Sequence, residues 1–142
     1  MKAIRTLHEG LTRVVPEAAI ALLLRLGIAA PFLLSGRTKV EGALTLTDTT
    51  FFLFQEDYRL PFLAPEPAAY LATYAEHLFP ILIILGLATR LSAAALLVMT
   101  IVIQIFVVPL GWPTHLLWAG PLVYLIARGP GAWSVDRALR LD

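Results

Sequence analysis

The fold class of this chain is decided by residues 91–127, LSAAALLVMTIVIQIFVVPLGWPTHLLWAGPLVYLIA. This stretch carries no Asp, Glu, Lys or Arg over about 37 residues, whereas a helix crosses the hydrocarbon core of a bilayer with about 20. The run Pro109-Leu110-Gly111-Trp112-Pro113 interrupts it near the middle and predicts a turn. The stretch therefore predicts two antiparallel membrane-spanning helices, so any function is performed in a membrane.

The composition of the whole chain agrees with this setting. Its 142 residues are 58% hydrophobic and 15% charged, whereas soluble domains average about 45–50% and about 25%. The chain contains no cysteine, which excludes disulfides, thiolate metal sites and Cys-ligated iron–sulfur clusters formed by this chain. No cleavable signal peptide, nucleic-acid-binding patch or phosphate-binding loop is expected. We expect a multi-pass protein of the inner (plasma) membrane that contacts lipid.

Four apolar segments predict an all-α, integral membrane four-helix bundle that forms a single domain over residues 1–142. The fourth segment is the shortest, at roughly 24 Å for a rise of about 1.5 Å per residue. A short turn that contains Arg90 makes the second and third segments antiparallel neighbours. The predicted spans are residues 17–36, 67–88, 91–108 and 112–127.

The distribution of Lys and Arg among the connecting segments predicts the orientation. One side carries Lys2, Arg5, Arg13, Arg90, Arg128, Arg137 and Arg140. The other side carries Arg37, Lys39 and Arg59, together with the acidic residues Glu41, Asp48, Glu56, Asp57 and Glu66. Because cytoplasmic loops are enriched in basic residues, both termini are expected in the cytoplasm.

Two extramembrane pieces have amphipathic patterns. In the outer loop, residues 37–66, the segment Leu44–Tyr58 predicts a short interfacial helix with Phe51 to Phe54 on its apolar face. The alternative is an irregular lid packed over the bundle. In the tail, Ser134 is a candidate N-cap of a second short interfacial helix, with Asp136 in its first turn.

Three polar residues lie at similar depths in three different predicted spans: Arg25, Glu76 and Gln104. An intramembrane Arg costs about 2.5–3.5 kcal/mol on insertion scales, so it needs a partner or water. Topology therefore predicts a midplane cluster of these three side chains. The cluster is either a structural ion pair that fixes helix register or the polar end of a binding pocket, and the sequence leaves both interpretations open.

The remaining candidates are aromatic or histidine side chains. Tyr74, His77 and Trp118 are candidate pocket walls. His77 and His115 are candidate ligands for haem or a metal such as copper, but neither belongs to a repeated ligand spacing, so no metal site is expected. No nucleophile–base pair is apparent, and no catalytic residue is assigned.

The order of short motifs resembles that of the DoxX family of small four-helix membrane proteins. Arg25-Leu26-Gly27 with Phe32, Ser35, Gly36 and Lys39 is similar to the family's R-x-G…F…SG…K opening. Glu76 followed by Gly86-Leu87-Ala88-Thr89-Arg90 is similar to its E…GLxTR stretch, and Gly129-Pro130-Gly131 with Ser134 and Asp136 is similar to its tail. The resemblance covers most of the chain, from about residue 21 to residue 136.

The resemblance implies a redox-associated function. Some members of the family are linked to quinone-coupled sulfur oxidation and others to oxidative-stress complexes, while distant relatives act as membrane chaperones or cargo receptors. The stretch 73–87, Trp112-Pro113-Thr114-His115 and the tail also resemble a subset found beside peptide-modifying, copper-handling systems.

The leading hypothesis is an auxiliary membrane subunit that docks a redox partner protein and holds a quinone between its helices. The first alternative is a membrane assembly or chaperone factor without redox chemistry, whose outer loop binds a client. The second is a small transporter, which would need to be a homo-oligomer because four helices without an internal repeat leave little room for alternating access. Whether the chain has any enzymatic activity is left open by its residues.

Overall fold

The computed structural model describes residues 16–141 as an elongated, mostly helical molecule. Three helical stretches are long and apolar enough to cross a membrane, which confirms the predicted membrane class. The third of these continues through a π-helical turn, and the fourth long helix has 17 residues. The elements are α2 (Glu17–Arg37), α4 (Pro65–Leu85), α5 (Thr89–Val102), the π turn η1 (Ile103–Val107), the 3₁₀ turn η2 (Pro109–Gly111) and α6 (Trp112–Arg128).

The turn between α4 and α5 occupies residues 86–88 and is as short as the sequence predicted. Helix α4 ends at Leu85 because Gly86 follows it in the left-handed region, with φ +69°. The carboxylate of Asp136 accepts hydrogen bonds from the N–H groups of Ala88 and Thr89, and α5 begins at Thr89. Both helix boundaries therefore lie before the predicted residues 88 and 91.

The long helices pack in neighbouring pairs, α2 with α4 and α5 with α6. Small buried residues such as Ala29 and Ala93 let the helix backbones approach closely. Large apolar side chains such as Leu23, Leu91 and Leu117 point outward and are exposed. The main core contains Ile28, Ala29, Phe32, Ile83, Ala93, Leu96, Leu122 and Leu125.

The loop after α2 differs from the prediction. It begins with a two-stranded antiparallel hairpin, β1 (Val40–Glu41) and β2 (Thr45–Leu46), which the all-α prediction lacked. The helix α3 (Asp48–Glu56) is shorter than the predicted segment because Thr47 caps it, accepting a bond from the N–H of Thr50. The buried Phe54 joins a second small core with Val40, Leu46, Ala68 and Ala69.

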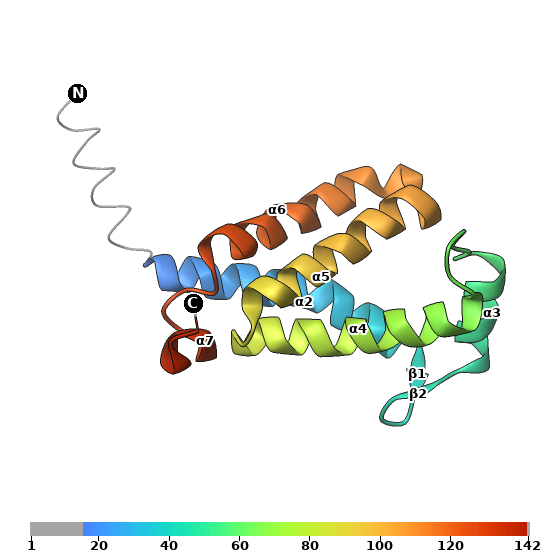
Figure 1. Ribbon diagram of the computed structural model, residues 1–142, viewed down its shortest axis with the longest axis horizontal. Coiled ribbons are helices and arrows are strands. Elements are labelled where there is room, and N and C mark those ends of the chain that lie inside the picture. Colours follow the sequence, from blue (N-terminus) through green and yellow to red (C-terminus); the bar gives the residue numbers. More distant parts are fainter. Residues whose placement is uncertain (1–15, 142) are drawn as a thin grey trace.

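The tail forms the short helix α7 (Val135–Leu139), with Ser134 as its N-cap as predicted. Figure 1 places α7 at the opposite end of the molecule from α3 and the hairpin. These are called the tail end and the hairpin end below. The basic residues Lys2, Arg5 and Arg13 lie outside the described residues.

Candidate functional site

A cavity of about 620 Å³ lies between the helices, toward the hairpin end. Its walls come from all four long helices, from α3 and from the segment between α3 and α4. Ligand pockets in proteins typically enclose about 300–1,000 Å³ and have mostly apolar walls with a few placed polar groups. This cavity has that character, because among its lining residues only Ser35, Lys39, Tyr58, Glu76, His115 and Trp118 carry a polar side-chain atom.

The mouth of the cavity lies on an apolar part of the surface. Three of its lining residues, Phe62, Leu71 and Val98, are 62%, 65% and 61% exposed. Leu71 belongs to α4 and Val98 to α5, so the opening lies beside these two helices. A ligand that enters here has to pass over apolar side chains.

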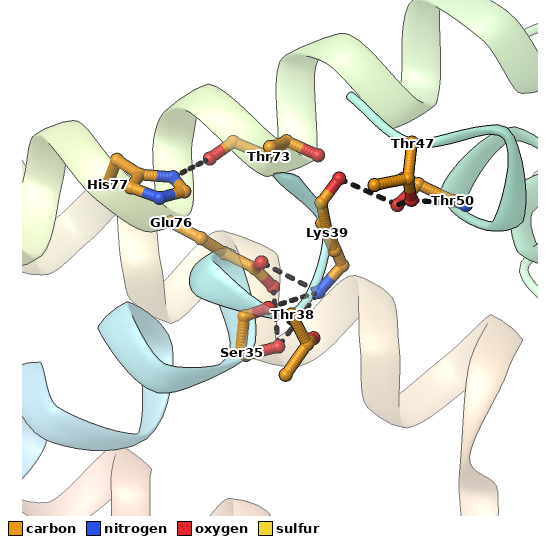
Figure 2. Close-up of polar contacts among 8 residues, drawn as sticks. All are labelled: Ser35, Thr38, Lys39, Thr47, Thr50, Thr73, Glu76 and His77. Carbon is orange, nitrogen blue, oxygen red and sulfur yellow. Dashed lines mark hydrogen bonds and ion pairs between the residues drawn. The ribbon is translucent and has the colours of Figure 1, made fainter. Parts of the chain in front are cut away.

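A buried ion pair forms one polar wall of the cavity (Figure 2). The Lys39 ammonium donates to Glu76 Oε2 at 2.7 Å, to Ser35 Oγ at 2.8 Å and to the Ser35 carbonyl at 3.3 Å. The Ser35 hydroxyl donates to Glu76 Oε1 at 3.3 Å. Lys39 and Glu76 are only 6% and 5% exposed. Burying two charges costs several kcal/mol per ion unless hydrogen bonds offset it, and this network supplies such bonds.

The local fold explains how Lys39 reaches that position. It follows the end of α2 and precedes β1, so its side chain turns back along the last turn of α2 toward Ser35. Its carbonyl accepts from the Thr50 hydroxyl at 2.8 Å and from the Thr47 N–H at 3.2 Å. These bonds tie the backbone of Lys39 to the start of α3, as Figure 2 shows for Thr50.

A second polar group faces the cavity from α6. His115 Nδ1 lies 2.6 Å from Gln104 Oε1, and the Gln104 amide donates to the Pro109 carbonyl at 2.7 Å. The rings of His115 and Trp118 are 5.3 Å apart, and Trp118 also packs against Phe32 at 5.2 Å. Gln104 itself is not among the lining residues, so its connection to the cavity is indirect, through its contact with His115.

Arg25 does not line the cavity and lies toward the tail end. We call its surroundings the tail junction, which consists of Arg25, residues 83–89 at the α4–α5 turn and residues 129–136 before and at the start of α7. Its Nε donates to the Ile83 carbonyl at 2.8 Å, and its Nη2 donates to the Ile84 carbonyl. Its Nη1 donates to the carbonyls of Trp133 at 2.6 Å and Pro130 at 3.3 Å. The last carbonyls of a helix lack partners within the helix. At the end of α4, Arg25 donates to the carbonyls of Ile83 and Ile84, and the N–H groups of Gly86 and Leu87 donate to those of Ile83 and Leu82.

The tail completes this junction. Asp136 accepts from Ala88 N at 2.7 Å and from Thr89 N at 2.9 Å, while its own N–H donates to the Gly86 carbonyl at 2.8 Å. A Cβ atom on Gly86 would lie 2.5 Å from Ser134 Cβ, so the tail packs directly on this glycine. Nearby, Arg90 donates to the last carbonyls of α6, Ile126 and Ala127. The tail junction is therefore a set of helix caps.

The predicted midplane cluster of Arg25, Glu76 and Gln104 does not form. Arg25 extends to the carbonyls at the end of α4, which are closer to it along the bundle than Glu76. Glu76 pairs with Lys39, which the topology argument had assigned to the outer loop. Gln104 pairs with His115 across the α5–α6 turn. Depth along each helix follows from the rise per residue, whereas the direction in which each long side chain extends does not.

Of the aromatic and histidine candidates, some line the cavity and others lie outside it. Trp118 lines the cavity, as does His115. Tyr74 is 44% exposed and outside the lining, and His77 donates through Nδ1 to the Thr73 carbonyl of its own helix at 2.7 Å. Within residues 16–141, no three His, Cys, Asp or Glu side chains are grouped as metal ligands.

Sequence reasoning missed Lys39 and Ser35 as cavity residues, although both are motif positions of the resemblance. The signal that identifies them is a Lys placed four residues after a Ser at the end of an apolar helix, where its side chain can reach back along the helix. Of the motif positions, Phe32, Ser35, Lys39 and Glu76 line the cavity. A Cβ atom on Gly36 would lie 2.8 Å from His77 Cε1, so Gly36 lets α2 approach α4, whereas Gly27 has open space around it.

In the comparison with known proteins, the chain matches the model of one protein family. The model of the DoxX family matches residues 20–109, which is more than half of the chain and ends before α6. No curated protein and no solved structure matches the chain significantly.

Proposed function

Because the chain belongs to the DoxX family, we propose that it is an auxiliary subunit of a redox system in the inner membrane and holds a quinone in its cavity. The observation that carries the proposal is the apolar cavity of about 620 Å³ with the buried Lys39–Glu76 pair in its wall. The chain has no cysteine and so no thiol pair of its own to transfer electrons, and the proposal assigns the redox chemistry to a partner protein.

The membrane arrangement proposed here has four crossings. Three helices meet the length and hydropathy that a crossing needs. Helix α6 is shorter, but it packs along α5 and exposes Leu116 and Leu117 at 62% and 74%, as a lipid-facing helix does. Thinning of the bilayer accommodates such a short span.

The charges at the two ends support the orientation with both termini in the cytoplasm. The tail end carries Arg90, Arg128, Arg137 and Arg140. The hairpin end carries Glu41, Asp48, Glu56, Asp57 and Glu66, with Arg37 and Arg59. By the excess of basic residues in cytoplasmic loops, the tail end faces the cytoplasm. Helices α3 and α7 then lie at the two interfaces, where the exposed Phe52 and Trp133 contact headgroups.

A quinone fits the chemistry of the cavity for two reasons. Its apolar tail can enter through the mouth beside Leu71 and Val98 directly from the lipid phase. Its ring carbonyl can accept a hydrogen bond from Lys39, in place of the 3.3 Å bond to the Ser35 carbonyl, the longest of the three. The bond to Glu76 keeps the ammonium in place during this exchange.

The position of α3 favours this function over that of an assembly factor with a client-binding loop. Phe54 and Tyr58 line the cavity, and the Phe51 ring packs against Tyr70 of α4 at 5.4 Å. The loop is thus part of the cavity wall. In this proposal, the redox partner or a second copy of the chain binds at the outer surface of the tail end.

The test is the quinone content of the protein purified in mild detergent from a host that makes quinones. Solvent extraction and mass spectrometry of the wild type should find bound quinone, and Glu76→Gln should lower it severalfold because the Lys39 ammonium loses its charged partner. The exposed Glu66→Gln is the matched control and should retain the quinone. Equal content in all three proteins, or none in the wild type, would contradict the proposal.

A further inference from the structure

The three groups Pro109, Gln104 and His115 form a chain of hydrogen bonds whose direction is fixed. The Pro109 carbonyl can only accept, so the Gln104 atom 2.7 Å from it is the amide nitrogen. The amide oxygen of Gln104 therefore faces His115 Nδ1 at 2.6 Å. Because this oxygen can only accept, the proton of a neutral His115 lies on Nδ1.

This tautomer leaves Nε2 of His115 with a free lone pair. Within residues 16–141, no group donates a hydrogen bond to this nitrogen, and it belongs to a side chain that is 8% exposed and lines the cavity. An acceptor in apolar surroundings that lacks a partner is unfavourable. A ligand that brings a hydrogen-bond donor to this wall would satisfy it.

The backbone around this group is unusual. The π turn η1 contains Gln104, and the Val108 N–H donates to the Ile103 carbonyl at 2.8 Å across it. Such turns occur mostly as single insertions in α-helices and often at functional sites. A Cβ atom on Gly111 would lie 2.8 Å from His115 Cε1, so a glycine here leaves room for the imidazole. The backbone on both sides of the α5–α6 turn thus positions one side-chain pair.

We propose, building on the quinone-binding function above, that His115 accepts a hydrogen bond through Nε2 from a ring hydroxyl of the cavity ligand. The cavity then selects the hydroxyl-bearing quinol head group over a ring that lacks a hydroxyl hydrogen. Gln104 is a positioning residue, because it fixes the tautomer of His115. Lys39 and Glu76 hold the ligand at a different wall and are not required for this selection.

The first experiment compares two probes, a decyl benzoquinol and its dimethyl ether, in which a methyl group replaces each ring hydroxyl hydrogen. Equilibrium binding of the radiolabelled probes to the full chain in detergent should favour the quinol by about tenfold, because the bound ether covers the Nε2 acceptor without donating to it. His115→Phe should remove the preference and leave binding of the ether unchanged. The exposed Trp112→Phe, at the start of the same helix, is the control and should keep the preference.

The outcomes separate the two proposals. If the wild type binds both probes equally, or His115→Phe keeps the preference, the role of His115 is wrong while quinone binding stands. If the wild type binds neither probe but its purified form contains quinone, the role of His115 is wrong and quinone binding stands. If the purified protein also contains no quinone, both proposals fail.

A second measurement reports on the tautomer directly. The chain has three histidines, so ¹⁵N labelling of histidine gives a simple NMR spectrum in which His115→Phe identifies the signals of His115. We expect a protonated Nδ1 and a bare Nε2, and a shift of the Nε2 signal on addition of the quinol but not of the ether. A proton on Nε2, or no shift with the quinol, would overturn the proposal. Gln104→Leu should allow both tautomers.

Discussion

Arg25 at the tail end and Lys39 at the hairpin end are both buried cations, 2% and 6% exposed, yet their surroundings differ in kind. Arg25 donates only to backbone carbonyls, from α4 and from the tail. Lys39 pairs with a carboxylate beside a cavity of about 620 Å³. The first arrangement closes the ends of helices, and the second keeps a charged pair next to space that a ligand can fill. Burial of a charge alone therefore does not identify a functional site.

The largest effect on stability is expected when the cation at the tail end is removed. Arg25→Leu removes a donor from four carbonyls, of which that of Ile83 keeps the bond from the Gly86 N–H and three are left unpaired within residues 16–141. At about 1–3 kcal/mol for each unpaired buried group, it should lower the free energy of unfolding by at least about 3 kcal/mol. Thermal unfolding in detergent measures this, with the exposed Arg128→Leu as control. An Arg25→Leu protein as stable as the control would show that the junction is not structural.

A substitution in the tail, on the other side of the same junction, should lower stability by a smaller amount. Asp136→Ala removes the acceptor for the N–H groups of Ala88 and Thr89 and also the carboxylate whose charge acts on Arg25, and loss of the cap by itself costs about 0.5–2 kcal/mol. The unfolding temperature should fall, whereas Asp57→Ala, an exposed change at the hairpin end, should not change it. Quinone content per folded chain should stay at the wild-type value in both variants, and a selective loss in Asp136→Ala would contradict the separation of the two regions.

At the hairpin end, neutralising the pair should affect the ligand more than the fold. Lys39→Met alone leaves the Glu76 carboxylate buried without its partner and should cost about 3–5 kcal/mol. The double variant Lys39→Met with Glu76→Gln has no buried charge, so its stability should lie within about 1 kcal/mol of the wild type. The double variant should still have lost its quinone. A stable double variant that retains quinone would show that the pair is only structural.

The smallest expected effect concerns a residue that sequence reasoning placed in the pocket. Tyr74 is 44% exposed and outside the cavity, so Tyr74→Phe should change neither stability nor quinone content. Trp118→Leu, in contrast, removes a cavity wall that packs against Phe32 and His115 and should lower quinone content. Equal results for the two variants would place the ligand elsewhere.

The helices were predictable because each one is a long apolar run bounded by Gly, Pro or charge, as at Gly86 and Pro65. The tail helix was predictable from Ser134 for the same kind of local reason. These features depend on neighbours in the sequence, where periodicity and capping rules apply.

The partners of the polar residues depend on distant parts of the chain. Arg25 binds carbonyls of residues 83, 84, 130 and 133, and carbonyls have no signature in a sequence. In the sequence, Lys39 is a residue of the outer loop, and only the folded structure shows that its side chain extends toward Glu76. The π turn that positions Gln104 has no compositional signal either. The candidate site was therefore predictable in its residue types but only partly in its pairings.

The most direct test of the central claim is photochemical cross-linking of an azidoquinone to the wild-type protein, with the labelled residue mapped by mass spectrometry. A ligand in the cavity should label residues of its inner wall, such as Phe79 and Met99, and excess unlabelled quinone should suppress that label. Label spread over lipid-facing residues such as Leu23 and Leu117, or concentrated at the tail junction, would contradict the account.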